Sequence, residues 1–173
     1  NDVFKIPPEK IKVSAPDVGG GFGLKNFLFP EWVLLLWASK KLGRPVKWVA
    51  ERSEDNSSAL HGRDITTDAR LALDKDGRFL ALEADLTANM GAYLSAGGPN
   101  ASTNAASTAM GGVYNIPYVF MSSKGVFTNT TPVDAYRGAG KPEANFIIER
   151  LIDIAAAKFN FDPVELRLSL IHI

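Results

Sequence analysis

Two glycine-rich turns, far apart in the sequence, have residue types that let a ligand approach bare backbone. The first is GGGFG at residues 19–23 and the second is AYRGAG at residues 135–140. Glycine accepts positive φ and has no side chain, so backbone N–H groups can come close to a phosphate or an oxo group. Each turn precedes a predicted helix, whose first turn adds partial positive charge. Taken alone, the first turn is better explained as a plain tight turn, and the second turn alone is weak evidence for a ligand site.

Neither turn matches a common nucleotide motif. Lys25 follows the first turn without the glycine before it and the Ser or Thr after it that a Walker loop requires, and GGGFG does not fit GxGxxG. Arg137 stands between Tyr136 and Gly138 in the second turn. Three interpretations of the Arg137 guanidinium stay open: it is exposed on the surface, it pairs with an acid, or it contacts a cofactor phosphate.

Local patterns around the first turn predict a β-loop-α-β unit. Residues 10–14 alternate apolar and polar side chains as a half-buried strand would. An apolar run begins after Pro30 and ends before Gly43. Proline in the first turn and glycine just after the last residue are typical of a helix, here over residues 30–42. Residues 45–50 return to a period of two and predict a second strand.

A long antiparallel hairpin is predicted over residues 65–88. Its turn is DKDG at residues 74–77, where glycine accepts positive φ. The leucines of the two strands are expected to share a buried face: Leu71, Leu73, Leu80, Leu82 and Leu86. Two short strands are predicted at residues 118–121 and 124–127.

Two helices are predicted near the end of the sequence. The first begins at Pro142, and its expected apolar face is Phe146, Ile147, Ile148, Leu151 and Ile154. The second begins after Asp162-Pro163, an N-cap and first-turn pair, and is expected to include the final ELRLSLIHI. Residues 91–112 are rich in small side chains and predict a loop and a short helix that lie against another part of a larger protein.

Composition restricts the class of partner and site. The chain has 173 residues with 19 basic and 19 acidic side chains, so no net charge attracts nucleic acid or an anionic membrane. It has no cysteine, which excludes disulfides and cysteine-held iron–sulfur clusters within this chain. The longest apolar run, residues 33–38, is too short to span a bilayer. We expect a cytoplasmic protein and, because there is no initiator methionine, a piece of a longer one.

Five stretches, in the same order along the chain, resemble the molybdenum hydroxylase family: GGGFGLK (19–25), GRPVK (43–47), GAY (91–93), YNIP (114–117) and AYRGAGKPE (135–143). That family includes xanthine dehydrogenase, aldehyde oxidoreductase and the large subunit of aerobic carbon monoxide dehydrogenase, and AYRGAGKPE most resembles its carbon-monoxide-dehydrogenase-like subgroup. The resemblance implies an α+β fold with a mixed sheet and packed helices. It also implies that residues 1–173 are part of a molybdopterin-binding domain.

The resemblance assigns a cofactor to the two turns. It implies molybdenum–molybdopterin, expected in the cytosine dinucleotide form in the full-length enzyme. The implied cofactor contacts are Gly21, Phe22, Gly23, Tyr136, Arg137 and Gly138. The family's glutamate base lies beyond residue 173, so no catalytic residue and no metal ligand are assigned here. Glu143 and Glu149 are interpreted as a solvated face or structural ion pairs.

Departures from the family pattern restrict the substrate. Asn26 and Ala139 stand where purine-oxidising relatives carry a glutamate and an aromatic, and Ala105 stands near the place of an arginine. Gly138 stands where carbon monoxide dehydrogenase has the cysteine that bridges copper and molybdenum. The expected activity is oxidation of an aldehyde or an N-heteroaromatic compound with water as the oxygen source.

The implied partners are the rest of the subunit, iron–sulfur and flavin subunits and a small-molecule substrate. The isolated chain is expected to be inactive and to self-associate through surface left uncovered, much of it in residues 94–113. Two alternatives stay open: a module that binds an anion without chemistry, and a scaffold derived from the same fold.

Overall fold

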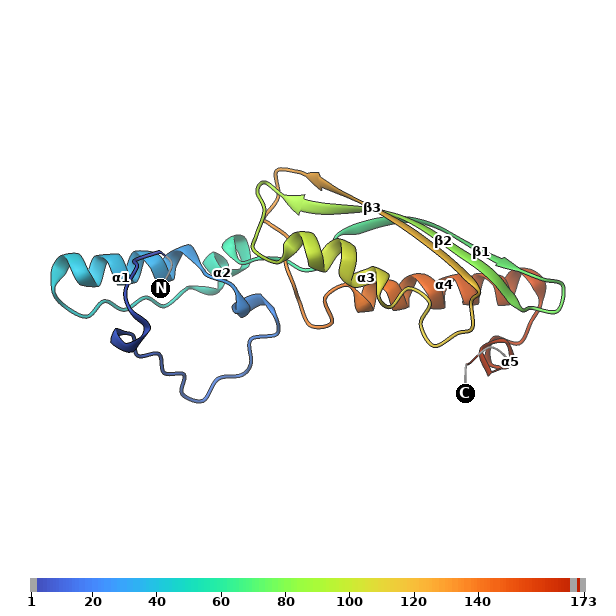
Figure 1. The fold of residues 1–173 in the computed structure, drawn as a ribbon, viewed down its shortest axis with the longest axis horizontal. Helices are drawn as coiled ribbons and strands as arrows, with labels where there is room; N and C mark the ends of the chain where they lie inside the picture. The colour runs from blue at the N-terminus through green and yellow to red at the C-terminus, as the bar shows by residue number, and fades with distance from the viewer. Residues whose placement is uncertain (1–2, 169–170, 172–173) are drawn as a thin grey trace.

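A three-stranded mixed sheet organises the chain, and helices cover one of its faces (Figure 1). The computed structural model describes residues 3–168 and 171. The strands are β1 (Ile65–Leu73), β2 (Phe79–Gly91) and β3 (Tyr118–Phe127), in the order β1-β2-β3. β1 pairs with β2 antiparallel, and β3 pairs with β2 parallel. The predicted α+β class with a mixed sheet and a long hairpin is confirmed.

Only some of the helices lie against this sheet. In Figure 1, α1 and α2 extend away from one end of the sheet, and α4 runs beneath it. The α-helices are α1 (Pro30–Leu42), α2 (Arg52–Ser58), α3 (Ala105–Ser107), α4 (Lys141–Phe159) and α5 (Pro163–Leu168). Two short 3-10 helices are η1 (Pro8–Lys10) and η2 (Leu24–Asn26), and η3 (Asn100–Asn104) is a short π-helix.

The core lies between the sheet and α4. Its largest fully buried side chains are Leu82, Leu86, Met110, Ile148 and Ile152. Strand alternation places most of the predicted leucines on this face. Leu80 is the exception, at 46% exposure. The register shifts between the pairs Ala72↔Ala81 and Leu73↔Phe79, so Leu80 is the extra residue of a bulge and does not face the core.

The buried face of α4 differs from the predicted one. Ile147 and Ile148 are buried as expected, but Phe146 and Ile154 are 70% and 46% exposed. The remaining buried residues are Ala144, Ile152, Ala155 and Ala156. The prediction chose the largest apolar side chains, whereas the sheet contacts a stripe that includes three alanines because they let the helix approach closely.

The predicted β-loop-α-β unit does not form, although its helix is confirmed with the bounds Pro30–Leu42. Residues 10–14 and 45–50 form no strand, and neither segment pairs with another strand within the described residues. Val13 is 87% exposed. The two short strands predicted at residues 118–121 and 124–127 are one strand, because Ser122 and Ser123 continue the ladder with β2.

The small-residue segment 91–112 packs partly within this chain. It forms the predicted loop and short helix, but Ala106 and Met110 are 0% and 1% exposed in the core beside the sheet. The expectation that much of residues 94–113 would be exposed therefore does not hold at these two positions or at Gly98 and Ala101, which are also buried. Leu94 and Val113 are exposed. Among the described residues, no helix is both long and apolar enough to cross a membrane.

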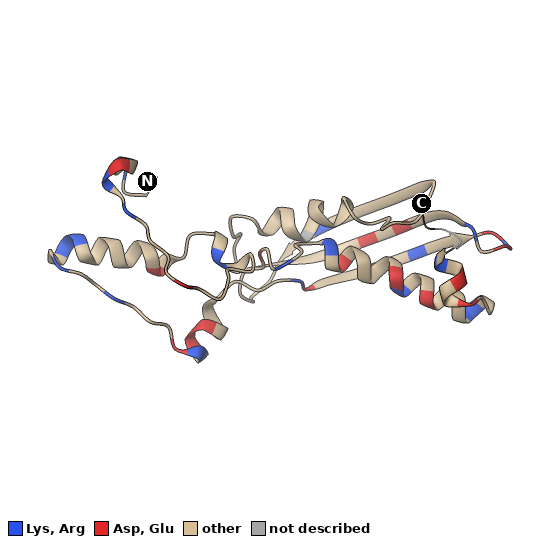
Figure 2. Cartoon of the chain, turned by 90° about the horizontal axis from the view of Figure 1, so that it is seen from below, with Lys and Arg blue, Asp and Glu red and all other residues tan. Residues whose placement is uncertain are grey.

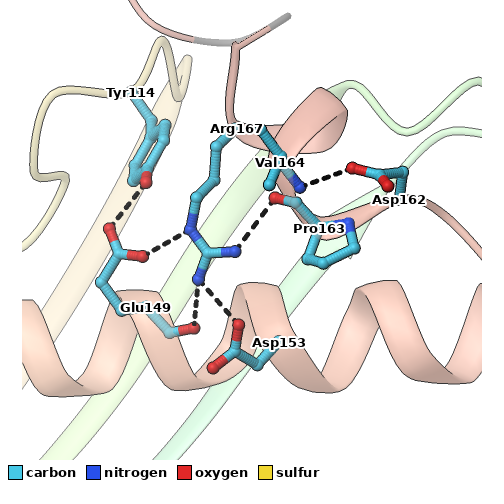
Figure 3. Close-up of polar contacts among 7 residues, drawn as sticks. All are labelled: Tyr114, Glu149, Asp153, Asp162, Pro163, Val164 and Arg167. Carbon is cyan, nitrogen blue, oxygen red and sulfur yellow. Dashed lines mark hydrogen bonds and ion pairs between the residues drawn. The ribbon is translucent and has the colours of Figure 1, made fainter.

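A polar cluster joins α5 to α4 (Figure 3). Glu149 accepts hydrogen bonds from the Tyr114 hydroxyl at 2.6 Å and from Arg167 Nε at 2.8 Å, and Arg167 Nη2 pairs with Asp153 at 2.8 Å. Burial and the Glu149 hydrogen bond raise the pKa of Tyr114 to about 12. Bonds to Asp153 and Glu149 raise the pKa of Arg167. Glu149 is thus a structural ion-pair residue, as interpreted from the sequence.

The predicted N-cap of α5 is confirmed. The backbone N–H groups of Val164 and Glu165 donate to the Asp162 carboxylate at 2.8 and 2.9 Å. Such a cap satisfies donors that the first helical turn leaves without partners. The structure describes α5 as far as Leu168, so the predicted continuation of this helix through residues 169–173 lies mostly outside the described residues.

Candidate functional site

The two glycine turns lie against each other in the fold. Gly23 has φ 87°, and a Cβ built on it would lie 3.0 Å from the carbonyl oxygen of Ala135 and 3.4 Å from Cα of Tyr136. This approach leaves no room for a side chain, which gives a physical reason for glycine at position 23. The two turns, which are separate in the sequence, therefore contact each other at Gly23.

Arg63 binds backbone carbonyl groups of the second turn. Its Nη2 donates to the carbonyl oxygen of Arg137 at 2.7 Å, and its Nη1 donates to that of Tyr136 at 3.3 Å. The guanidinium also lies 5.6 Å from the centre of the Tyr136 ring and 3.5 Å from a carboxylate oxygen of Glu143. Glu143 therefore acts as the partner of this arginine, in agreement with the ion-pair interpretation.

Buried Asp134 joins the second turn to the loop at residues 95–98. Asp134 is 2% exposed, and its carboxylate accepts hydrogen bonds from the backbone N–H groups of Gly97, at 3.1 Å, and of Ala135. Its own N–H donates to the carbonyl oxygen of His61 at 2.8 Å. Burying a carboxylate is costly unless it is hydrogen-bonded. These hydrogen bonds therefore fix the second turn and the loop at residues 95–98 relative to each other.

The far end of the second turn packs against η3 and α3. Gly140 has φ 89°, and a Cβ there would lie 2.7 Å from the carbonyl oxygen of Ala101 and from the N of Ala106. Gly138 has φ 97°, and its Cβ would lie 2.5 Å from Cγ of Pro142. The turn is therefore constrained on both sides before α4 begins at Lys141.

The first turn has an exposed aromatic side chain, Phe22, and backbone N–H groups without acceptors. Gly20 and Phe22 have φ values of 110° and 53°, and Phe22 is 47% exposed. Lys25 and Asn26 donate their N–H groups to the carbonyl oxygens of Gly21 and Gly23, which closes the turn into η2. The N–H groups of Gly20 and Phe22 have no hydrogen-bond acceptor among the described residues.

The second turn presents donors in the same way. Tyr136 is 45% exposed, and Arg137 and Gly138 are also exposed. Within residues 3–168, neither the N–H of Arg137 nor that of Gly138 has an acceptor, and the Arg137 guanidinium has no ion-pair partner. The joined turns thus expose backbone N–H groups, two aromatic rings and one cation. This arrangement suits an anionic, oxygen-rich group rather than a bare metal ion.

Three supporting residues were not predicted from the sequence. They are Gly62, whose Cβ would lie 2.6 Å from Cβ of Tyr136, together with Arg63 and Asp134. Arg63 and Asp64 both have positive φ, at 74° and 61°, which is unusual for residues with side chains. The HGRD sequence contains one glycine as a turn signal, but it does not reveal which turn the arginine contacts.

Comparisons with known proteins show what the chain is similar to. The family model described as molybdopterin cofactor-binding domain matches residues 1–170. The carbon monoxide dehydrogenase large chain of Hydrogenophaga pseudoflava is 40% identical over 164 residues, which are 94% of this chain and 20% of that protein.

Solved structures show the same fold. Quinoline 2-oxidoreductase from Pseudomonas putida 86 has 39% identity and a TM-score of 0.85, over 91% of this chain and 20% of that one. Carbon monoxide dehydrogenase from Oligotropha carboxidovorans has 34% identity and a TM-score of 0.89, over 98% and 21%. The chain thus spans about a fifth of the length of these relatives.

Proposed function

The chain belongs to the molybdopterin cofactor-binding domain family, and from that premise we propose that its two joined turns form part of a molybdenum–molybdopterin site. The proposed contacts are Gly21, Phe22, Gly23, Tyr136, Arg137 and Gly138. The observation that supports this proposal most directly is the contact of Gly23 with the Ala135–Tyr136 backbone, because it brings both sets of contacts onto one face.

The residues present fit an oxygen-rich cofactor. The exposed N–H groups of Phe22, Arg137 and Gly138 are donors without protein acceptors in the described part of the chain. Oxo ligands, pterin carbonyl groups and phosphate oxygens are acceptors that such donors satisfy. The small side chain at position 139 suits a flat substrate ring beside the turn.

When bound, the cofactor supplies two-electron oxidation in which the inserted oxygen comes from water. The part of this chain is to orient the cofactor and the substrate. Arg63 fixes the carbonyl side of the second turn, so the N–H groups of the same turn keep one direction. Phe22 and Tyr136 place aromatic surface beside the site, where they limit the access of water to a bound substrate.

The proposed activity is oxidation of an aldehyde or an N-heteroaromatic substrate by the whole subunit. The name of quinoline 2-oxidoreductase supports the heteroaromatic class. Carbon monoxide oxidation is disfavoured despite the 40% identity to a carbon monoxide dehydrogenase, because the chain has Gly138 and no cysteine. Iron–sulfur and flavin partners, the cytosine dinucleotide form and a glutamate base outside this chain complete the proposal.

The test is the molybdenum content of the protein that carries this chain, purified with its neighbouring subunits. We expect stoichiometric metal and pterin by elemental and optical analysis. Arg137→Ala should lower cofactor retention, since the Arg137 guanidinium has no ion-pair partner among the described residues, whereas Arg78→Ala at the exposed hairpin turn should not. Absence of metal and pterin, in cells that load a related enzyme, would favour a scaffold or an anion-binding module without redox chemistry.

A further inference from the structure

Asn89 is a buried amide near the end of β2, and it is not one of the proposed cofactor contacts. Strand alternation places it on the same face of the sheet as Asp85 and Thr87, which are both exposed. Asn89 itself is only 8% exposed. A buried amide is costly to the fold unless its donors and acceptors have partners. The partners of Asn89 therefore show what this side chain holds in place.

The Asn89 side chain makes all four hydrogen bonds that a carboxamide can make. Its Nδ2 donates to a carboxylate oxygen of Asp64 at 2.6 Å and to the Thr130 hydroxyl at 2.8 Å. Its Oδ1 accepts from the N–H of Gly91 at 2.7 Å and from the Thr128 hydroxyl at 2.8 Å. The carboxylate only accepts and the N–H only donates, so these two partners fix the orientation of the amide. An apolar side chain of the same size satisfies none of them.

Through Asp64, Asn89 acts on the residue that binds the second turn. Arg63 and Asp64 have φ values of 74° and 61°, a conformation that costs energy for residues with side chains. The N–H of Asn89 donates to the carbonyl oxygen of Asp64 at 3.0 Å, so Asp64 is bound through both its backbone and its carboxylate. These two contacts hold the backbone from which the Arg63 side chain reaches the carbonyl oxygens of Tyr136 and Arg137.

Asp64 is bound to this amide although basic residues are common around it. Figure 2 shows acidic and basic residues interspersed along the sheet and the helices. Asp64 nonetheless has no ion-pair partner in the described part of the chain, and its neighbour Arg63 pairs with Glu143 instead. The carboxylate of Asp64 is therefore left for Asn89, and the guanidinium of Arg63 is left for Glu143 and the second turn.

Asn89 also holds the segment that leads into the second turn. Thr128 and Thr130, which bond to its side chain, belong to the loop after β3, and residues 131–134 of that loop continue directly into the turn. The N–H of Ala92 donates to the carbonyl oxygen of Thr130 at 3.0 Å, which keeps the loop beside the end of β2. One amide thus binds both the segment before β1, which carries the arginine, and the segment after β3, which carries the turn.

We propose that Asn89 is a positioning residue of the second turn, which acts chiefly through Asp64 and Arg63 to keep the N–H groups of the turn in one direction. Without the amide, the Asp64 carboxylate loses its partner and the backbone at Arg63 leaves its costly conformation. The turn then opens although its own sequence is unchanged. For what the turn binds, this role rests on the proposed function, whereas the ordering of the turn depends on contacts within this chain.

The test measures amide hydrogen exchange by mass spectrometry in the whole protein that carries this chain, purified with its neighbouring subunits. The readout is the segment 135–141, where the N–H of Ala139 donates to the carbonyl oxygen of Tyr136 at 2.7 Å. Asn89→Leu and Arg63→Met should each raise exchange there at least about tenfold. The double variant should exchange no more than about twice as fast as the faster single variant, because independent effects would multiply.

Two further variants separate this role from general stability. Ser122→Ala removes a hydrogen bond to Asp85 in the same β2–β3 ladder, far in sequence from the turn, so exchange of residues 135–141 should stay native. Thr128→Val removes one of the four bonds to Asn89 and keeps the shape of the side chain. It should raise exchange in the same segment by a smaller factor, and it decides the question if Asn89→Leu fails to fold.

Molybdenum content, measured on the same samples, tests the link to the proposed function. Asn89→Leu should retain less metal than the native protein. A native protein without metal and pterin would refute the proposed function, while the exchange comparison would still decide the role of Asn89.

Positioning by Asn89 is overturned if neither Asn89→Leu nor Thr128→Val changes exchange in residues 135–141. It is also overturned if Ser122→Ala raises that exchange as much as Asn89→Leu does, or if the effects of Asn89→Leu and Arg63→Met multiply in the double variant.

Discussion

The guanidinium of Arg63 donates a hydrogen bond to the backbone carbonyl of Arg137 at 2.7 Å, across 74 residues of sequence. A side chain that precedes β1 therefore holds the turn that precedes α4. In the same turn, the N–H groups of Arg137 and Gly138 have no acceptor among the described residues and are the donors proposed for a ligand. Arg63 is a positioning residue for the proposed site, and it contributes to the stability of the same region.

Replacing Arg63 should destabilise the chain more than replacing a fully exposed arginine. In Arg63→Met, two carbonyl oxygens and the Glu143 carboxylate lose a partner, and a loss of about 1–3 kcal/mol in the free energy of unfolding is expected. Arg70→Met, which removes an exposed pair with Glu83, should change that free energy by less than about 1 kcal/mol. Urea unfolding of both variants tests this difference, and equal losses would contradict it.

Gly23→Ala should disturb the contact between the turns. Position 23 has φ 87°, and the added methyl group would lie 3.0 Å from the Ala135 carbonyl oxygen. We expect a loss of about 1–3 kcal/mol together with faster proteolysis of the loop. Gly19→Ala is the control, since a Cβ there has no neighbour within 4 Å and φ is not positive. If both variants resist protease equally, the contact does not restrain the loop.

The core stripe of α4 can be tested with two isoleucines. Ile152 is 0% exposed and Ile154 is 46% exposed. Ile152→Ala should cost about 2–5 kcal/mol because it leaves a cavity against the sheet. Ile154→Ala should cost less than about 1 kcal/mol. Thermal unfolding of the two variants distinguishes them, and the reverse order would show that the helix is rotated.

Tyr114 makes stability depend on pH at the alkaline end. Its pKa is raised to about 12 from an ordinary value of 10.0, so the folded state binds its proton more tightly than the unfolded state. The resulting stabilisation is complete below pH 10 and is lost as pH rises from 10 to 12. The stability difference between the native chain and Tyr114→Phe should therefore shrink over this interval. Denaturant titrations at several pH values measure it, and a constant difference would refute the assignment.

Local sequence signals predicted the elements that depend on local physics. The hairpin turn at residues 74–77, the bounds of α1 and the Asp162 cap all follow from residues within a few positions of each other. Glycine in both turns was also informative, because positive φ is a local requirement. These features need no knowledge of which segments meet.

Features that depend on tertiary partners were not predictable from one sequence. The segments at 10–14 and 45–50 have strand-like alternation but no neighbouring strand. The bulge that turns Leu80 outward is a property of the β1–β2 pairing. The contact of Arg63 with the second turn joins residues that no periodic pattern connects. Thus the fold brings the two predicted turns into contact at Gly23, while the residues that support the turns were found only in the fold.

The sequence separations within the sheet and the site imply an order of assembly. The hairpin contact Arg70–Glu83 spans 13 residues, the β2–β3 contact Asp85–Ser122 spans 37, and the Arg63–Arg137 contact spans 74. Since the entropy cost of closing a loop rises with its length, the hairpin should form early and the joined turns last. A surface completed in the last step of folding is one whose completion the proposed cofactor can drive, so we expect a nascent chain to stay locally open there until that cofactor binds.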